Sequence, residues 1–103
     1  MNKVILITGC SSGFGMLTAA RLSARDHTIY ATMRNLQKQD ALKMELKQRG
    51  TKCQILHLDV TDDNSISKVI NTIEKQDSRL DILINNAGYG IGGFFEDLSL
   101  IHI

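Results

Sequence analysis

Proline and tryptophan are absent from this chain of 103 residues, and aromatic residues make up only 5% of it. Long apolar runs are also missing: stretches such as Val4 to Ile7 are far shorter than the roughly 18 to 20 residues of a membrane-spanning helix. No segment has the flanks and the cleavage site of a secretory signal. We therefore expect no membrane span and a cytoplasmic protein.

Cysteine is scarce, with only Cys10 and Cys53 present. The two form no CxxC pair and have no His at a spacing typical of metal ligands, so neither a disulfide nor a structural metal site is expected. Nucleic-acid binding is disfavoured as well. It is typical of basic domains with aromatic platforms, whereas this chain has a pI near 7.8.

The net charge of +1 conceals an asymmetry along the chain. Residues 1–52 carry nine Lys and Arg against three Asp and Glu, whereas residues 53–103 carry three against eight. We interpret most of the basic excess as the solvated side of one helix. The residues concerned are Lys38, Lys43, Lys47, Arg49 and Lys52. At this length the chain buries one core, so residues 1–103 are treated as a single domain without a second, substrate-binding domain.

Strands and helices are predicted to alternate. Four short apolar or β-branched runs predict buried strands at residues 3–8, 28–32, 53–58 and 80–84. Helices are predicted over residues 16–24, from a cap at Asn35 to about Arg49, and after an N-cap cluster at residues 61–64, with a further helix opening near residue 94. The positions expected to face inward are Leu36, Leu42, Leu46, Ile66, Val69, Ile70 and Ile73.

This alternation predicts an α/β fold, a partial Rossmann fold whose doubly wound parallel sheet has the strand order 3-2-1-4. Ligands bind such sheets at the carboxyl ends of the strands, where the strand order reverses. Here that point lies between the first and the fourth strand. Two Gly-rich loops, at residues 9–15 and 85–93, follow these two strands. The sequence therefore places both loops at one crevice.

The first loop reads TGCSSGFG. Gly9, Gly13 and Gly15 permit a tight turn close to a ligand, and the helix that follows offers free N–H groups to a pyrophosphate. Ser11 and Ser12 add hydroxyl donors for a phosphate. No Lys-Ser or Lys-Thr follows the last Gly, so a Walker loop and nucleoside triphosphatase activity are disfavoured. The alternative is a tight connection without a ligand.

Met33 and Arg34 follow the second predicted strand. An NAD site has a carboxylate near this place for the ribose hydroxyls, and Met33 cannot supply one. Arg34 suits a 2′-phosphate, so the pair favours NADP over NAD, unless Arg34 is only a surface residue at the start of a basic helix. After the third strand, Asp59 either accepts from the adenine amino group or caps the next helix.

Three motifs in this order and spacing resemble the short-chain dehydrogenase/reductase family: TGxxxGxG at residues 8–15, Asp59-Val60, and NNAG at residues 85–88. The stretches TGCSSGFG, YATMRN and NNAGYG are most similar to the branch with the 17β-hydroxysteroid and retinol dehydrogenases. The resemblance implies a bound dinucleotide. It assigns the pyrophosphate side to Gly9, Ser11, Ser12, Gly13, Phe14 and Gly15, the 2′-phosphate to Arg34, adenine to Asp59 and Val60, and the nicotinamide ribose to Asn86, Ala87 and Gly88.

The family's catalytic Ser, Tyr and Lys have no counterpart in this chain. Tyr30 and Tyr89 are not followed four residues later by Lys, and the three His are scattered over a loop, a strand and the tail. We therefore expect no catalytic residue here and interpret His27, His57 and His102 as structural or surface residues.

Members of the family are much longer, so we expect a fold truncated after its fourth strand and inactive by itself. Its exposed strand edge and apolar surface would favour self-association. In a complete protein, a hydride would pass between the nicotinamide and an apolar carbonyl compound or secondary alcohol. Two alternatives stay open: a non-catalytic nucleotide-binding or interaction module, and a truncated product without a stable function.

Overall fold

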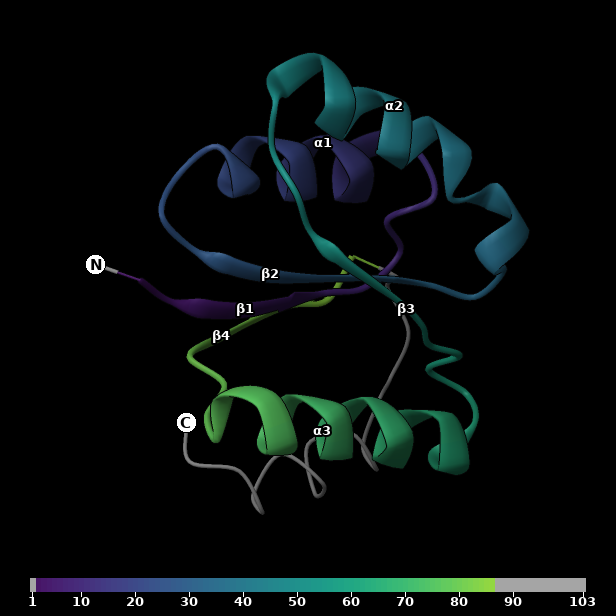
Figure 1. Ribbon diagram of the computed structural model, residues 1–103. Coiled ribbons are helices and arrows are strands. Elements are labelled where there is room, and N and C mark those ends of the chain that lie inside the picture. Colours follow the sequence, from purple (N-terminus) through teal and green to yellow (C-terminus); the bar gives the residue numbers. More distant parts are fainter. Residues whose placement is uncertain (1, 87–103) are drawn as a thin grey trace.

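A four-stranded parallel sheet lies at the centre of the computed structural model, which describes residues 2–86. The strand order is β3-β2-β1-β4, so the predicted order 3-2-1-4 is confirmed. Helices α1 and α2 cover one face of the sheet and α3 covers the other (Figure 1). The elements are β1 Val4–Ile7, α1 Gly13–Ser23, β2 Thr28–Met33, a 3-10 turn Leu36–Lys38, α2 Asp40–Arg49, β3 Gln54–His57, α3 Asp63–Asp77 and β4 Ile82–Ile84.

Strand β1 is buried along its whole length because both faces of the sheet are covered. Val4 and Leu6 belong to the core beneath α3, whereas Ile5 and Ile7 belong to the core beneath α1 and α2. The alternation of side chains along a strand therefore divides four consecutive apolar residues between two cores. Because both faces of β1 are buried, all four of its residues can be apolar.

Helix α3 forms one of these cores as its sequence predicted. Ile66, Val69, Ile70 and Ile73 are all buried, as expected for apolar residues that recur on one helical face. The Asp62 side chain caps the helix by accepting a hydrogen bond from the Asn64 N–H over 3.0 Å.

The segment before α2 corrects one prediction. Instead of one helix from Asn35 to Arg49, a 3-10 turn precedes α2, because the Asn35 side chain accepts from the Gln37 N–H over 2.9 Å and closes a tighter turn. Leu36 in this turn is 37% exposed, so the prediction that it faces inward is wrong. Leu42 and Leu46 are buried as predicted, and Gly50 ends α2 with a φ of 69°.

Helix α1 begins three residues earlier than the predicted residue 16. Its first turn is closed by a hydrogen bond of 3.4 Å from the Met16 N–H to the Ser12 carbonyl. Glycines at this turn hide the apolar periodicity that marks the rest of the helix. Gly13 and Gly15 therefore belong to the helix as well as to the loop.

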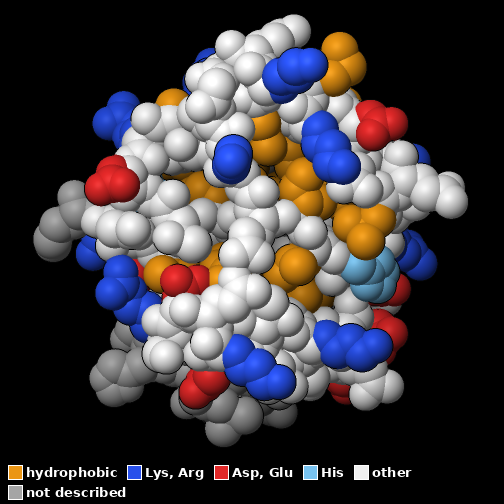
Figure 2. Space-filling model, in the orientation of Figure 1, with side chains coloured by type: hydrophobic (Ala, Val, Ile, Leu, Met, Phe, Trp, Pro, Cys, Tyr) orange, Lys and Arg blue, Asp and Glu red, His pale blue; other side chains and the backbone are white. Residues whose placement is uncertain are grey.

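Charged side chains lie mainly over the helices, whereas hydrophobic side chains show in strips between them on the face drawn in Figure 2. The five basic residues assigned to a solvated helix side, from Lys38 to Lys52, are all exposed. Lys43, Lys47 and Arg49 lie on α2, whereas Lys38 lies in the 3-10 turn and Lys52 follows the helix, so the interpretation is confirmed for solvent exposure but not for a single helix. Within residues 2–86, no helix is long and apolar enough to cross a membrane.

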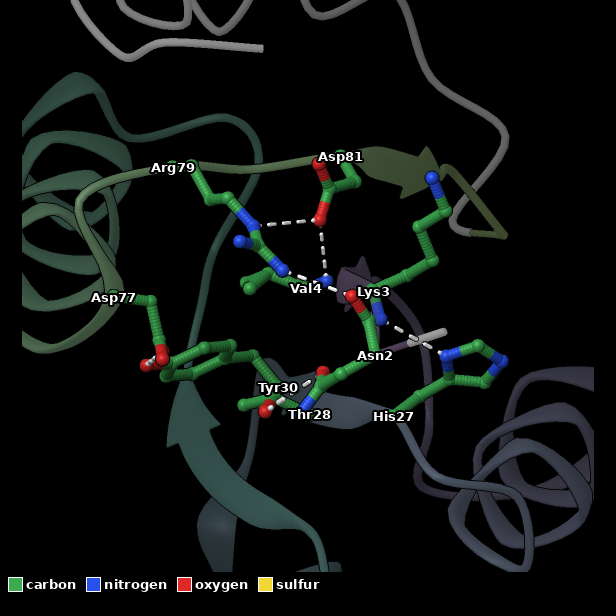
Figure 3. Close-up of polar contacts among 9 residues, drawn as sticks. All are labelled: Asn2, Lys3, Val4, His27, Thr28, Tyr30, Asp77, Arg79 and Asp81. Carbon is green, nitrogen blue, oxygen red and sulfur yellow. Dashed lines mark hydrogen bonds and ion pairs between the residues drawn. The ribbon is translucent and has the colours of Figure 1, made fainter.

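Polar contacts tie together the amino ends of β1, β2 and β4, at the end of the sheet where these strands begin (Figure 3). One Asp81 carboxylate oxygen accepts from the Val4 N–H over 2.7 Å and from the Arg79 guanidinium over 3.0 Å. Arg79 also donates to the Asn2 carbonyl over 2.8 Å. The ring of His27 accepts from the Lys3 N–H over 3.1 Å, in agreement with its expected structural role. The hydrogen bond from Val4, supported by Arg79, holds the pKa of Asp81 below its ordinary value.

Replacement of Ile73 by Ala tests the core beneath α3. Ile73 is fully buried, so we expect Ile73→Ala to lower the free energy of unfolding by about 2 to 5 kcal/mol. Ile82→Ala removes the same atoms at a position that is 41% exposed, and we expect it to cost much less. Urea unfolding followed by circular dichroism measures both, and equal losses would contradict the assignment of the core.

Replacement of Asp81 by Asn tests the contacts at the amino ends. Because the folded pKa of Asp81 lies below its ordinary 3.8, the ionised carboxylate stabilises the fold above that pH, and this contribution disappears as the pH falls through the lower folded value. We expect the melting temperature of Asp81→Asn to be lower than that of the unmodified chain at neutral pH and to approach it in acid. Asp26→Asn, at an exposed position outside these contacts, is the control. A difference that stays constant with pH would rule out this role for Asp81.

Candidate functional site

A cavity of about 310 Å³ opens at the carboxyl ends of the strands, but neither Asn85 nor Asn86 of the second Gly-rich loop lines it. Its walls come from the segments that follow β1, β2 and β3. Four of the predicted site residues line it: Gly9, Arg34, Asp59 and Val60. Sequence reasoning missed three further lining residues, Thr8, Leu58 and Thr61. Thr8 and Leu58 end predicted strands, and the rule that ligands bind at these ends could have found them.

The first Gly-rich loop folds back tightly on the start of α1. Gly9 has a φ of 67° and Gly13 a φ of 60°, values that favour glycine. Gly15 is required by space instead, since a Cβ there would lie 2.8 Å from the Gly9 carbonyl carbon and 2.7 Å from the Asn86 side-chain nitrogen. The loop can pass close to a ligand because no side chain fills these positions.

The amino end of α1 is suited to an anion. Ser12 precedes the helix in an extended conformation, and its side chain makes no capping hydrogen bond, so its hydroxyl does not satisfy the N–H groups of the first turn. That turn holds no acidic residue. The helix dipole therefore acts at this end without a compensating carboxylate in the turn. Ser11 is half-buried and Phe14 is 82% exposed, and neither lines the cavity.

Side-chain hydrogen bonds join the two loops that follow β1 and β4. The Asn86 amide donates to the Gly9 carbonyl over 3.2 Å, and the Thr8 hydroxyl donates to the Asn85 amide oxygen over 3.0 Å. The backbone N–H of Thr8 also donates to the Ile84 carbonyl. The Asn pair therefore connects the loops that follow the neighbouring strands β1 and β4. Ala87 and Gly88, the other two residues predicted here, lie outside the described residues.

Asp59 is held in place within the cavity wall. One of its carboxylate oxygens accepts from both the Thr61 hydroxyl, over 2.6 Å, and the Thr61 N–H, over 2.9 Å. These hydrogen bonds, aided by the nearby Arg34, lower the pKa of Asp59, so the group is ionised at neutral pH. Asp59 does not cap α3, because Asp62 does. The helix-cap alternative for Asp59 is therefore wrong.

Arg34 lies beside this carboxylate at the rim of the cavity. Its Nε is 3.6 Å from the other oxygen of Asp59, and its side chain is 80% exposed. Met33, by contrast, is 1% exposed and packs in the core beneath α1 and α2. The end of β2 thus presents a cation to the cavity and no carboxylate.

The Ser65 hydroxyl lies next to His57 and Asp59, but the three residues do not form a nucleophilic site. The Ser65 hydroxyl oxygen accepts from the Asp59 N–H over 2.9 Å and lies 3.4 Å from Nδ1 of His57. Ser65 is only 5% exposed, so a substrate cannot reach its hydroxyl. The arrangement instead fixes the segment between β3 and α3.

Three further reactive side chains among the described residues, those of Tyr30, Cys10 and Cys53, are unsuited to catalysis. Tyr30 is buried and its hydroxyl donates to Asp77, and burial above all raises its pKa. Burial likewise raises the pKa of Cys10 to about 12 and that of Cys53 to about 11, so both thiols stay protonated. Among residues 2–86, no cluster of three or more His, Cys, Asp and Glu could hold a metal ion.

Comparison with known sequences shows to which family the chain belongs. A sequence model described as short chain dehydrogenase matches residues 3–103. The chain belongs to the short-chain dehydrogenase family. It is 40% identical over 94 residues to 3-ketodihydrosphingosine reductase of Bacteroides thetaiotaomicron, covering 91% of this chain and 31% of that relative.

The expected branch of the family is also represented among its relatives. Retinol dehydrogenase 8 of Bos taurus is 37% identical over 102 residues, covering 95% of this chain and 32% of the relative. 17-beta-hydroxysteroid dehydrogenase type 1 of Mus musculus is 38% identical over 99 residues, covering 90% and 28%. The chain spans about a third of the length of the curated relatives it matches.

Solved structures agree with the family. A metagenomic short-chain oxidoreductase crystallised in complex with NADP superposes with a TM-score of 0.75 at 27% identity, covering 85% of this chain and 40% of that one. The similarity confirms the expected Rossmann-like architecture.

Replacement of Gly15 by Ala tests the close approach between the loop and α1. An added Cβ would displace the Gly9 carbonyl, so we expect a loss of about 1 to 3 kcal/mol of stability. It should also shift the NMR signal of the Asn86 side-chain amide, which donates to that carbonyl. Gly13→Ala is the control, because its Cβ meets nothing within 4 Å and only backbone strain is added. An unmoved Asn86 signal in Gly15→Ala would contradict the proposed packing.

Proposed function

We propose that this chain forms the cofactor-binding part of an NADP-dependent short-chain oxidoreductase. One observation carries the proposal: the end of β2 offers a cation and no carboxylate. The exposed Arg34 lies at the rim of the cavity, whereas Met33, the last residue of β2, is buried and apolar. An NAD site uses an acidic residue here for the ribose hydroxyls, whereas an Arg suits a 2′-phosphate.

The residues of the site fit such a dinucleotide. Gly9 and Gly13 place no side chain near the amino end of α1, and Gly15 lets the loop pack closely against this helix. This end would hold the pyrophosphate together with Ser11, Ser12 and Phe14. The cavity wall formed by Asp59 and Val60 would receive adenine. Asn86, with Ala87 and Gly88, would lie along the nicotinamide ribose. This assignment rests on the chemistry of the donors and on the close packing around Gly15.

The reaction of the whole protein would be hydride transfer between nicotinamide and a carbonyl compound or a secondary alcohol. Relatives named for 3-ketodihydrosphingosine and for retinol support a substrate with a carbonyl or hydroxyl group on an apolar body. Tyr30, the one tyrosine within residues 2–86, is buried and its hydroxyl donates to Asp77, so it is not available for the accompanying proton transfer. We therefore expect the 103-residue chain to bind the cofactor without catalysing turnover.

Calorimetric titration of the chain with NADPH and, separately, with NADH tests this proposal. We expect saturable binding of both, tighter for NADPH, because only NADPH carries the phosphate that Arg34 would meet. Equal affinity for the two would overturn the NADP preference. Lack of binding to either by a folded chain would overturn the assignment of the site.

Replacement of Arg34 by Asp tests the phosphate contact. A hydrogen-bonded contact to a charged group contributes enough that its loss should weaken NADPH binding roughly ten- to hundredfold. NADH binding should be unchanged or improved, because the new carboxylate can accept from the ribose hydroxyls. Arg25→Asp makes the same charge change at an exposed position before β2 and is the control. A preference left unchanged by Arg34→Asp would remove Arg34 from the site.

A further inference from the structure

The ion pair between Arg34 and Asp59 joins a fixed anion to a freely exposed cation. Thr61 occupies one oxygen of Asp59 with two hydrogen bonds, which leaves the other oxygen 3.6 Å from Nε of Arg34. The Asp59 side chain is 22% exposed, whereas that of Arg34 is 80% exposed. The guanidinium can therefore move away from the pair more easily than the carboxylate can.

This arrangement affects any anion that Arg34 binds. Both side chains line the same cavity, so a phosphate that reaches the guanidinium also comes close to the Asp59 carboxylate. The exposed pair is itself weak and easily exchanged for a phosphate. The repulsion between phosphate and carboxylate remains after the exchange, because Thr61 holds the carboxylate in place.

We propose that Asp59 is a specificity-determining residue: as the fixed counter-ion of Arg34, it limits how strongly the site prefers a cofactor with a 2′-phosphate. The inference rests on the proposed function, since it concerns the same cofactor. It differs from a contact with adenine, because adenine is present in NADPH and NADH alike. An adenine contact changes both affinities together and cancels in their ratio, whereas the counter-ion changes the ratio.

Asp59→Asn separates these roles. The Asn oxygen can still accept from Thr61, so the local fold is kept while the charge is removed. We expect the ratio of NADPH to NADH affinity, measured by calorimetric titration, to rise roughly three- to tenfold, as expected for removing one like charge near a phosphate in a largely aqueous setting. The rise should shrink at high salt, because exposed charges are screened.

Asp62→Asn is the matched control. Asp62 lies three residues further along, accepts a similar backbone hydrogen bond from Asn64, and does not line the cavity. It loses the same charge, and we expect the affinity ratio to stay unchanged. A rise of the same size in both variants would mean that net charge acts without any specific role for Asp59, and would overturn the proposal.

Two further variants keep the proposal open to refutation. In an Arg34→Gln background, the rise caused by Asp59→Asn should be smaller, because Asp59 no longer competes with the phosphate for Arg34 and only the direct repulsion between carboxylate and phosphate is left. Thr61→Val removes the hydroxyl that holds Asp59 and should raise the ratio to a lesser extent, which supplies a second measurement if Asp59→Asn folds poorly.

Two other results for Asp59→Asn would contradict the inference. A ratio that falls in Asp59→Asn would show that Asp59 positions Arg34 for the phosphate, and an unchanged ratio would show that the pair does not affect specificity. Either result overturns this inference while leaving NADP binding intact. Failure of the unmodified chain to prefer NADPH would instead overturn the proposed function.

Discussion

Strand β1 lies between β2 and β4, and its side chains enter the two cores of the protein alternately. Like the five consecutive buried residues of β2, the four residues of β1 are nearly excluded from solvent, and β1 pairs with a strand on each side. Its burial fixes the carboxyl end of β1, from which the first Gly-rich loop leaves. The position of the candidate site therefore depends on the packing of β1.

The Gly9 carbonyl connects this core to the site. It packs against α1 at Gly15, where no Cβ can be accommodated, and it accepts from the Asn86 amide beyond β4. Two segments far apart in the sequence are thus held together by one backbone group. The first turn of α1 includes Gly15, so the amino end of the helix lies at this point of contact. The proposed site for an anionic ligand depends on this close packing more than on any single polar side chain.

Much of the fold could be read from the sequence because burial imposes simple patterns. Apolar runs bounded by Gly or polar residues predicted all four strands to within about two residues, and the spacing of Ile66, Val69, Ile70 and Ile73 predicted the buried face of α3. The failures occurred where local hydrogen bonds decided the outcome. The Asn35 side chain accepts a hydrogen bond from Gln37 and closes a 3-10 turn that leaves Leu36 exposed. The apolar character of Leu36 alone had suggested that it faces inward.

The candidate site likewise combines features that the sequence determined with features that only the tertiary structure decided. The sequence by itself determined the α/β order, the Gly-rich loop, and the presence of Arg34 where a carboxylate would favour NAD, because these depend on residue types at fixed spacing. The tertiary structure decided which groups share the cavity. It brought Thr61 onto Asp59, gave the capping of α3 to Asp62, and set the Asp59 carboxylate beside Arg34. Arg34 and Asp59 come from the ends of two different strands, and the parallel pairing of β2 with β3 brings those ends together.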